Sequence, residues 1–307
     1  MAQNPVIKHP FTADPSIHRW SDGKFYIYGS HDKDHPRIWD MSDYHVFSSD
    51  DMLTWTDHGV VLDNKQTPWG GPFWAPDAAE KDGHYYIYFP EGHQICVADS
   101  PSPTGPFENP RILYKMPEGY VQAYDPAYFE WEGDSYVVFS ERASLKTPFY
   151  PVIVKLSENL DEVVEKYELP PMQAFHEGPW IFFRNGKTYM LGGGGKTLRY
   201  WMADSPFGPY DYKGDFFFGT KEHTISKTAH GSTIEVDGQW YCAGHYDVYP
   251  GDPYRRTTVI EYMNFNSDGT IQPIFITRDG IKPISSNTNL DNTPEASKKS
   301  NKSKTKR

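Results

Sequence analysis

One short pattern recurs five times along this chain, and a repeat of this kind constrains the fold more than any single segment does. In each copy a polar residue precedes a glycine, two variable residues follow, and an aromatic-rich run comes next. The five glycines are Gly23, Gly83, Gly133, Gly186 and Gly238. They are 60, 50, 53 and 52 residues apart, which matches the length of one blade of a β-propeller.

Each copy also predicts its own local structure. Asp-Gly or Asn-Gly between two strand-like runs is a strong hairpin signal, because the tight turn needs positive φ at both central residues. Further strand-like runs follow each hairpin, so we predict an all-β fold: a five-bladed β-propeller over residues 4–285, with four antiparallel strands per blade. A helical repeat is disfavoured because only residues 157–167 show weak helical character. A β-sandwich has no reason to repeat with a fixed period.

A polar residue opens the first strand of every repeat. These residues are Asp14, Asp77, Asp125, Glu177 and His230, and they lie 9, 6, 8, 9 and 8 positions before the repeat glycine. Because the innermost strands of a propeller line its central channel, we expect these side chains to converge around the axis. Like charges in a partly desolvated cavity cannot all stay ionised, so burial should raise the pKa of at least one carboxyl. An acid and a base can then coexist at neutral pH.

Each of these residues has a structural interpretation when taken alone. Aspartate before proline commonly forms turns, and a histidine before glycine is more often a hydrogen-bonded core residue than a ligand. Turn chemistry does not explain acids at one repeat position in several blades, and this joint occurrence favours a functional site. Asp77 fits the structural interpretation best, because its offset differs and the segment 74–77 can shape a channel wall.

Composition limits the ligand and leaves the compartment open. Carboxylates outnumber Lys and Arg by 41 to 30 and the formal charge is -11, which argues against nucleic acid and favours a neutral or cationic ligand. The aromatic share of 16% supplies rings that can stack on sugars. Cys96 and Cys242 lie far apart in strand-like segments and are expected to be buried thiols.

The ends of the chain carry few signals. No apolar run approaches the ~18 residues of a membrane helix, and residues 1–10 lack a signal peptide. We therefore expect no membrane partner, and a secreted or periplasmic location only if a leader has been removed, with the cytoplasm as the alternative. Residues 286–307 are rich in Ser, Asn, Thr and Lys and are predicted to be a disordered basic tail.

Three segments together resemble family 43 of the glycoside hydrolases, five-bladed propeller enzymes that act on arabinose- and xylose-containing polysaccharides. The segments are Ala13 to Ile17, Tyr124 to Pro126 and His176 to Trp180. Matches at residues 28–32, 74–77, 100–107 and 230–232 occur in the same order. The resemblance spans about residues 4 to 285, and it departs from common members in a short connection at residues 89–97 and in the absence of a second β-sandwich domain.

The resemblance implies roles for the acids. Asp14 would be the general base, Glu177 the general acid, and Asp125 the group that orients Glu177 and raises its pKa. Further substrate contacts are expected from His31, Asp32, Trp74, Asp77, Tyr124, His230 and an arginine of the last blade, Arg256 or its neighbour Arg255. The family histidine that His230 resembles lies beside a calcium or sodium ion in some members. One imidazole does not make a calcium site, so such an ion would be held largely by water.

The leading hypothesis is a monomeric inverting hydrolase, without an organic cofactor, that cleaves α-L-arabinofuranosyl or β-D-xylosyl linkages of oligosaccharides or polysaccharides. An alternative from another class is a non-catalytic glycan-binding propeller. A third hypothesis keeps catalysis but changes the substrate, to galactofuranosides, to fructans, or to mannosides cleaved by phosphate. Fold alone cannot decide among these sugars.

Overall fold

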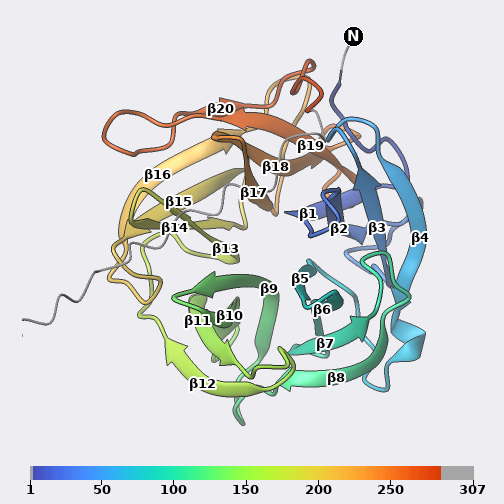
Figure 1. Ribbon diagram of the computed structural model, residues 1–307, viewed down its shortest axis with the longest axis vertical. Coiled ribbons are helices and arrows are strands. Elements are labelled where there is room, and N and C mark those ends of the chain that lie inside the picture. Colours follow the sequence, from blue (N-terminus) through green and yellow to red (C-terminus); the bar gives the residue numbers. More distant parts are fainter. Residues whose placement is uncertain (1–2, 285–307) are drawn as a thin grey trace, which may run out of the picture.

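Five small sheets surround a central axis in the computed structural model, which describes residues 3–284 of the chain (Figure 1). The first blade contains β1 (Thr12–Arg19), β2 (Phe25–His31), β3 (Asp43–Ser49) and β4 (Thr56–Asp63), followed by the short 3-10 helix Asn64–Gln66. The second contains β5 (Asp77–Lys81), β6 (His84–Glu91), β7 (Gln94–Ser100) and β8 (Glu108–Tyr114). The third contains β9 (Gln122–Trp131), β10 (Asp134–Arg142), β11 (Tyr150–Leu156) and β12 (Val163–Glu168).

The last two blades depart from four antiparallel strands. The fourth contains β13 (Glu177–Arg184), β14 (Lys187–Gly193), β15 (Thr197–Ala203), β16 (Asp211–Phe218) and the two-residue β20 (Ile274–Phe275). β20 pairs with β16 in the parallel direction. The fifth has three strands, β17 (Gly231–Val236), β18 (Gln239–Asp247) and β19 (Arg256–Met263). The predicted five-bladed propeller is confirmed: the first four blades each contain four antiparallel strands, to which blade four adds β20, and only the fifth has three.

The N-terminal segment covers the outer edge of β19, where a fourth strand would otherwise lie. The Val6 N–H donates to the Thr258 carbonyl at 3.0 Å, and the Ile260 N–H donates to Asn4 Oδ1 at 3.1 Å. The Asn4 amide also donates to Glu261 Oε1 at 2.8 Å. Because an uncovered strand edge leaves backbone groups unpaired, these bonds complete the last blade without a regular strand.

Aromatic and aliphatic side chains fill the spaces between neighbouring blades. One cluster joins blades one and two around Tyr28, Tyr44 and Phe89, and another joins blades one and five around Phe25 and Ile260. The second and third blades pack around Tyr88 and Phe139, and the largest cluster spans blades three to five. Both cysteines are buried and unpaired, as predicted.

Residues 157–167, whose sequence has weak helical character, contain no helix. The segment forms a turn and then β12, the outer strand of blade three, which pairs with β11 from Val152↔Glu168 to Leu156↔Val163. Pairing with an existing strand edge outweighs a weak local preference. No helix in residues 3–284 has the length and apolarity needed to cross a membrane. The predicted tail, residues 286–307, lies outside the described residues.

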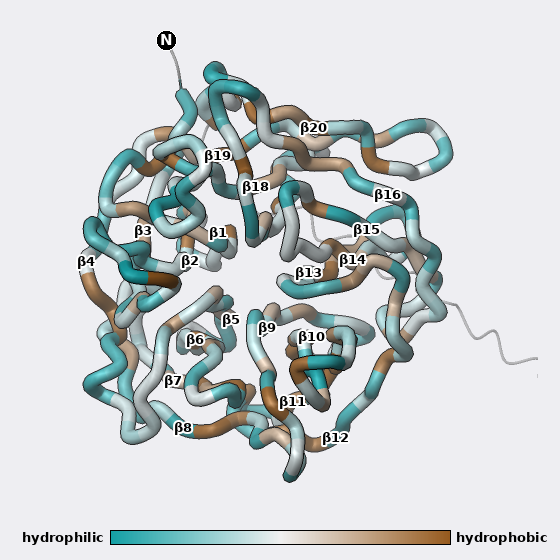
Figure 2. Tube along the Cα trace, turned by 180° about the vertical axis from the view of Figure 1, so that it is seen from behind, coloured by the Kyte–Doolittle hydropathy of each residue, from teal (hydrophilic) through white to brown (hydrophobic). Residues whose placement is uncertain are grey.

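The inner strands all point the same way along the axis. β1, β5, β9 and β13 also surround the axis when the molecule is viewed from behind (Figure 2). Their first residues therefore meet at one end of the channel, which is where the polar residues of the repeats were predicted to converge.

Candidate active site

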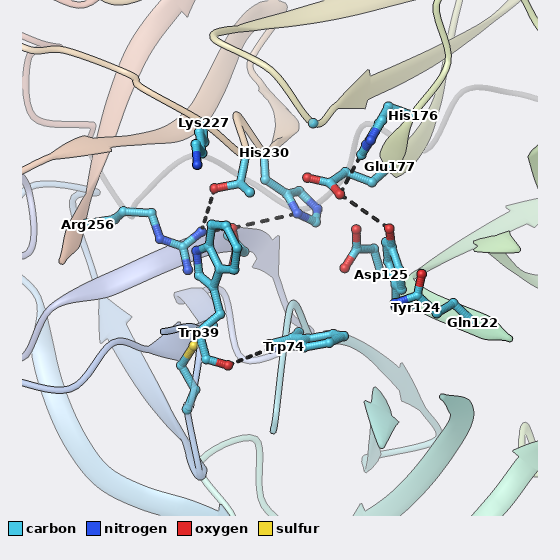
Figure 3. A pocket seen from close by; sticks show the side chains of 14 residues that line it. Trp39, Trp74, Gln122, Tyr124, Asp125, His176, Glu177, Lys227, His230 and Arg256 are labelled. Carbon is cyan, nitrogen blue, oxygen red and sulfur yellow. Dashed lines mark hydrogen bonds and ion pairs between the residues drawn. The ribbon is translucent and has the colours of Figure 1, made fainter. Parts of the chain in front are cut away.

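A cavity of about 360 Å³ occupies that end of the channel, and its wall is formed by residues of blades one, three, four and five, of the loop before β5 and of the segment before β17. Its lining residues are Asp14, Trp39, Met41, Trp74, Gln122, Tyr124, Asp125, His176, Glu177, Gly194, Lys227, Thr228, His230 and Arg256. Glu177, Asp125 and Tyr124 lie together on one side, and Arg256 and Lys227 lie on the other (Figure 3). The cavity thus combines several carboxyl groups with aromatic rings and cations.

A β-bulge recurs at this end of three inner strands. In β1, two residues at 14 and 15 lie opposite one residue of β2, since Ala13 pairs with Ser30 and Ser16 with Tyr28. The same count occurs in β9 at residues 125 and 126 and in β13 at 178 and 179. Bulges bend a strand and redirect its side chains. Here each bulge begins with a residue of positive φ followed by proline: Asp14 (51°), Asp125 (57°) and Gly178 (64°).

The bulges refine the predicted equivalence of the repeat acids. Asp14 and Asp125 occupy the same bulge position, but the blade-four residue at that position is Gly178. Glu177 lies one residue earlier, in register with Ala13 and Tyr124. Adjacent strand residues point to opposite faces, so this offset presents Glu177 to the cavity differently from the two aspartates. Glu177 is also more exposed than either aspartate.

Asp14 is held as an ion by its surroundings. Arg256 Nη1 donates to Asp14 Oδ1 at 2.8 Å, and Ser30 Oγ donates to Asp14 Oδ2 at 2.8 Å. The Asp14 N–H donates to His245 Nδ1 at 3.1 Å. Burial by itself would raise the pKa of Asp14, but the Arg256 charge, with smaller contributions from His245 and His230, lowers the pKa below its ordinary value. A carboxylate in this state can accept a proton.

Asp32 fixes the arginine that faces Asp14. Arg256 Nε donates to Asp32 Oδ2 at 2.9 Å and Nη2 donates to Asp32 Oδ1 at 2.8 Å, a bidentate pair. The Arg256 backbone N–H adds a bond to Asp32 Oδ2 at 2.9 Å. Burial raises the pKa of Asp32 to about 6 despite this arginine, so Asp32 is still ionised at neutral pH. Arg256 is therefore positioned by one buried carboxylate and directed at another.

Asp125 and Glu177 form the opposite part of the cavity. Asp125 is buried, and its Oδ2 accepts the Gly178 N–H at 3.0 Å. Burial, together with the charges of Glu177 and Asp14, raises the pKa of Asp125 well above its ordinary value. Glu177 Oε2 lies 3.5 Å from the Tyr124 hydroxyl and 3.2 Å from His176 Nδ1. The surroundings of Asp125 thus favour its protonated form, whereas those of Asp14 favour the ionised form.

Close backbone approaches set the position of His230. A Cβ on Gly178 would lie 3.2 Å from the His230 ring, and a Cβ on Gly193 would lie 1.6 Å from the Ala229 carbonyl oxygen. The glycines at these positions let β13 and the end of β14 pack directly against the segment that precedes β17. Burial lowers the pKa of His230, so its imidazole is neutral.

The donors around His230 do not suit a calcium ion. Calcium prefers six to eight oxygen ligands. The nearest carboxylate is Asp14, whose Oδ1 lies 3.8 Å from His230 Nδ1, and both Asp14 oxygens are already bonded to Arg256 and Ser30. Within residues 3–284, no group of three or more metal-ligating side chains includes His230. The predicted calcium or sodium ion is therefore not supported.

Three predicted substrate contacts lie outside the cavity wall. Asp77 is buried beneath it, where it accepts bonds from Ser16 and from the Tyr128 N–H at 2.5 Å and pairs with His18 at 2.6 Å. Asp32 acts on Arg256 as described above. His31, the last residue of β2, lies beside Asp43, the first residue of β3. The first two hold other parts of the site, and a carboxylate with its bonding capacity already used is poorly placed to bind a sugar.

The structure brings together the other predicted residues and selects one of two arginines. Arg256 lines the cavity, whereas Arg255 pairs with Asp252 at 2.5 Å and covers the Tyr249 ring. Sequence reasoning missed Trp39, Met41, Gln122, His176, Lys227 and Thr228. Most of them lie in loops or just before a strand, where no periodic pattern marks them. The run of four glycines at 192–195 is a sequence signal that could have indicated the close approach of Gly193 to the Ala229 carbonyl, next to His230.

Comparisons with known proteins identify relatives of this chain. The family model for glycosyl hydrolases family 43 matches residues 2–271. A xylosidase/arabinosidase of Humicola insolens is 34% identical, covering 87% of this chain and 98% of the relative. A β-D-galactofuranosidase of Aspergillus niger is 31% identical, covering 92% and 87%. Among solved structures, a β-xylosidase/α-arabinofuranosidase from a compost microbial metagenome, in a calcium-free complex with xylotriose, is 33% identical with a TM-score of 0.78, covering 90% and 98%.

Proposed function

This chain belongs to glycosyl hydrolase family 43 and is a glycosidase of xylosidase/arabinosidase type, and from that premise we propose that it hydrolyses α-L-arabinofuranosyl or β-D-xylosyl linkages with inversion. In this proposal Asp14 is the general base, Glu177 is the general acid, and Asp125 positions Glu177. The observation that carries it is the placement of Asp14, Asp125 and Glu177 around one cavity, where the surroundings of Asp14 lower its pKa and those of Asp125, which include Glu177, raise the pKa of Asp125.

The proposed mechanism is direct attack by water. An inverting glycosidase needs an acid at the leaving oxygen and a carboxylate ~6.5–9.5 Å away, with a water between them. Asp14 comes from β1 and Glu177 from β13, strands on different sides of the channel (Figure 1). A sugar between them can receive water activated by Asp14 while Glu177 protonates the departing oxygen. Glu177 would return to the acid form by taking a proton from solvent.

Asp125 would act on Glu177, and Arg256 would act on Asp14. The bond from the Gly178 N–H to Asp125 fixes the backbone next to Glu177, so Asp125 positions the acid. Arg256 keeps Asp14 ionised and oriented through the bond at 2.8 Å. Trp39, Trp74 and Tyr124 supply ring faces and edges for sugar binding at the cavity wall.

Product analysis tests this proposal. Aryl α-L-arabinofuranoside, β-D-xyloside and β-D-galactofuranoside are offered separately, and proton NMR records the anomer of the first product. We expect turnover of one of the first two substrates, an inverted anomer, and its loss in Glu177→Gln. Retention of configuration, or an unimpaired Glu177→Gln enzyme on every active substrate, would contradict the proposal.

Galactofuranoside hydrolysis is the second candidate, because one relative bears that activity in its name at 31% identity. The same screen separates the two, since a galactofuranosidase should turn over the third substrate fastest. Sugar binding without any turnover would favour a glycan-binding propeller. Turnover that depends on phosphate would favour a phosphorylase.

A further inference from the structure

A second cluster of side chains that can bind a metal ion lies outside the cavity, at one end of the two central strands of blade one. It consists of His31 at the end of β2 and of Asp43 and His45 on β3. One ligand atom from each residue lies within 4.8 Å of the other two. The three side chains are half-buried, and none lines the candidate active site.

Strand geometry places these side chains on one face. β2 and β3 are antiparallel, with Gly29 opposite His45 and Ser30 opposite Tyr44, so His31 lies across from Asp43. Asp43 and His45 are two residues apart on the same strand and therefore point to the same side. The two imidazole rings meet edge to face with centroids 4.5 Å apart.

The contacts within the cluster bring three possible metal-ligand atoms close together. His31 Nδ1 lies 2.6 Å from Asp43 Oδ1, and His45 Nε2 lies 3.8 Å from the same oxygen. Asp57, on β4, binds the other ring nitrogen of His45, with Nδ1 to Oδ1 at 2.9 Å. When Asp57 accepts the Nδ1 proton, the lone pair of His45 is on Nε2 and faces Asp43. A carboxylate behind a ligating histidine is the usual outer contact of a zinc ligand.

We propose that His31, Asp43 and His45 form a binding site for a divalent transition metal of the zinc class, with Asp57 orienting His45. Two imidazoles and one carboxylate suit Zn²⁺, Ni²⁺ or Cu²⁺, whereas Ca²⁺ and Mg²⁺ prefer sets of oxygen ligands. Three protein ligands leave at least one position for water or an external group. Two ligand atoms ~2.0–2.1 Å from a tetrahedral ion lie ~3.3 Å apart, so binding requires the 2.6 Å contact between His31 and Asp43 to open, His45 to approach them, and the proton shared by His31 and Asp43 to leave.

Other histidine–aspartate pairs lack part of this arrangement. His84 pairs with Asp99 at 3.1 Å and His9 pairs with Asp34 at 3.1 Å, each with one imidazole and one carboxylate. Among residues 3–284, the cluster in blade one is the group in which three ligand atoms converge. The His84 pair, on β6 and β7, therefore serves as a matched control.

Calorimetric titration of the EDTA-treated, desalted full chain with ZnCl₂ tests the site. We expect one zinc ion per chain, with binding weakened at least tenfold in His31→Gln and His45→Gln. Asp57→Asn should weaken it by roughly 10-fold, as expected when an outer carboxylate is removed. His84→Gln should bind zinc as wild type does. Absence of binding by the wild type, or unchanged binding in both ligand variants, would overturn the proposal.

Cobalt provides a measurement that needs no variant. Co²⁺ added to the wild-type chain should give the visible absorption of an ion with nitrogen ligands, and Zn²⁺ should displace it. A spectrum that stays that of the hydrated ion would count against the site. Circular dichroism of each variant shows whether it is folded, and Asp43→Asn replaces either histidine variant that is not.

Discussion

Arg256 Nη1 donates to Asp14 Oδ1 at 2.8 Å, although the two residues lie 242 positions apart in the chain. Arg256 is the first residue of β19 in the last blade, and Asp14 lies in the bulge of β1 in the first. Closure of the propeller ring is therefore what makes this contact. The ionised state of Asp14, the proposed base, therefore depends on the closed ring, because only the closed ring places Arg256 beside it.

Removal of the arginine should destabilise the fold. Arg256→Met leaves Asp14 and Asp32 as buried carboxylates without a counter-ion, and breaking a buried pair in this way costs about 3–5 kcal/mol. Urea unfolding measures the loss. Arg255→Met is the matched control, because Arg255 pairs with Asp252 nearer the surface. Equal unfolding midpoints for the two variants would contradict the role assigned to Arg256.

The identity of the acid can be tested through the leaving group. Glu177→Gln should lose about 10²–10⁴-fold in kcat on substrates whose leaving oxygen needs a proton. The loss should be much smaller with a dinitrophenyl leaving group, which departs without protonation. Glu235→Gln, an exposed glutamate on β17, should behave as wild type on both. An equal loss on both substrates would instead point to a role in water activation.

The acidic limb of the pH profile should report on Asp14. Its pKa is lowered in the folded protein, so the ionised form persists above the folded pKa and activity is lost as pH falls through that value. Ser30→Ala removes one donor to the carboxylate and should move the acidic limb of kcat/KM to higher pH.

Ser140→Ala is the control for this shift. Ser140 pairs with Tyr124 as Ser30 pairs with Ala13, but its hydroxyl has no hydrogen-bond partner among the described residues. The acidic limb of Ser140→Ala should therefore match that of the wild type. A shift of equal size in both serine variants would show that Asp14 is not the group being titrated.

Stability should also depend on pH through Glu261. This carboxyl accepts bonds from Asn4 and from the Thr277 N–H, yet burial raises its pKa to about 7. A carboxyl whose pKa is raised by folding contributes stability below its unfolded pKa near 4.5, and that contribution is lost as pH rises through about 7. Thermal unfolding between pH 4 and 8 should show this slope in the wild type and a shallower one in Glu261→Gln. Identical slopes would show that folding does not raise the pKa of Glu261.

Trp39 should contribute to substrate binding more than to chemistry. It lines the cavity through a loop, and its backbone carbonyl, which survives substitution, accepts the Trp74 Nε1–H at 3.0 Å. Trp39→Ala should therefore keep Trp74 in place and lower kcat/KM roughly tenfold, mainly through KM. Trp131→Ala, at the far end of β9, should leave KM unchanged. A drop in kcat alone would show that Trp39 affects the chemical step.

Much of the fold could be predicted from the sequence because of the repeat. Five Gly-containing turns predicted five blades because a hairpin turn is specified by two or three residues. The shared place of Asp14 and Asp125 followed from the same repeat, and their convergence followed from the geometry of a propeller. The outer strand β12 and the three-stranded fifth blade had no such local signal, since pairing with other segments of the chain decides them.

The sequence by itself determined the propeller, the end of the channel at which the acids meet, and the family. Only the tertiary structure decided that Asp77 and Asp32 support the site from below, that Arg256 and not Arg255 faces Asp14, and that Glu177 lies one residue before the bulge. It also brought His31, Asp43 and His45 together. These outcomes depend on strand register and on contacts between blades, because register fixes which face a side chain occupies and ring closure fixes which distant residue it meets.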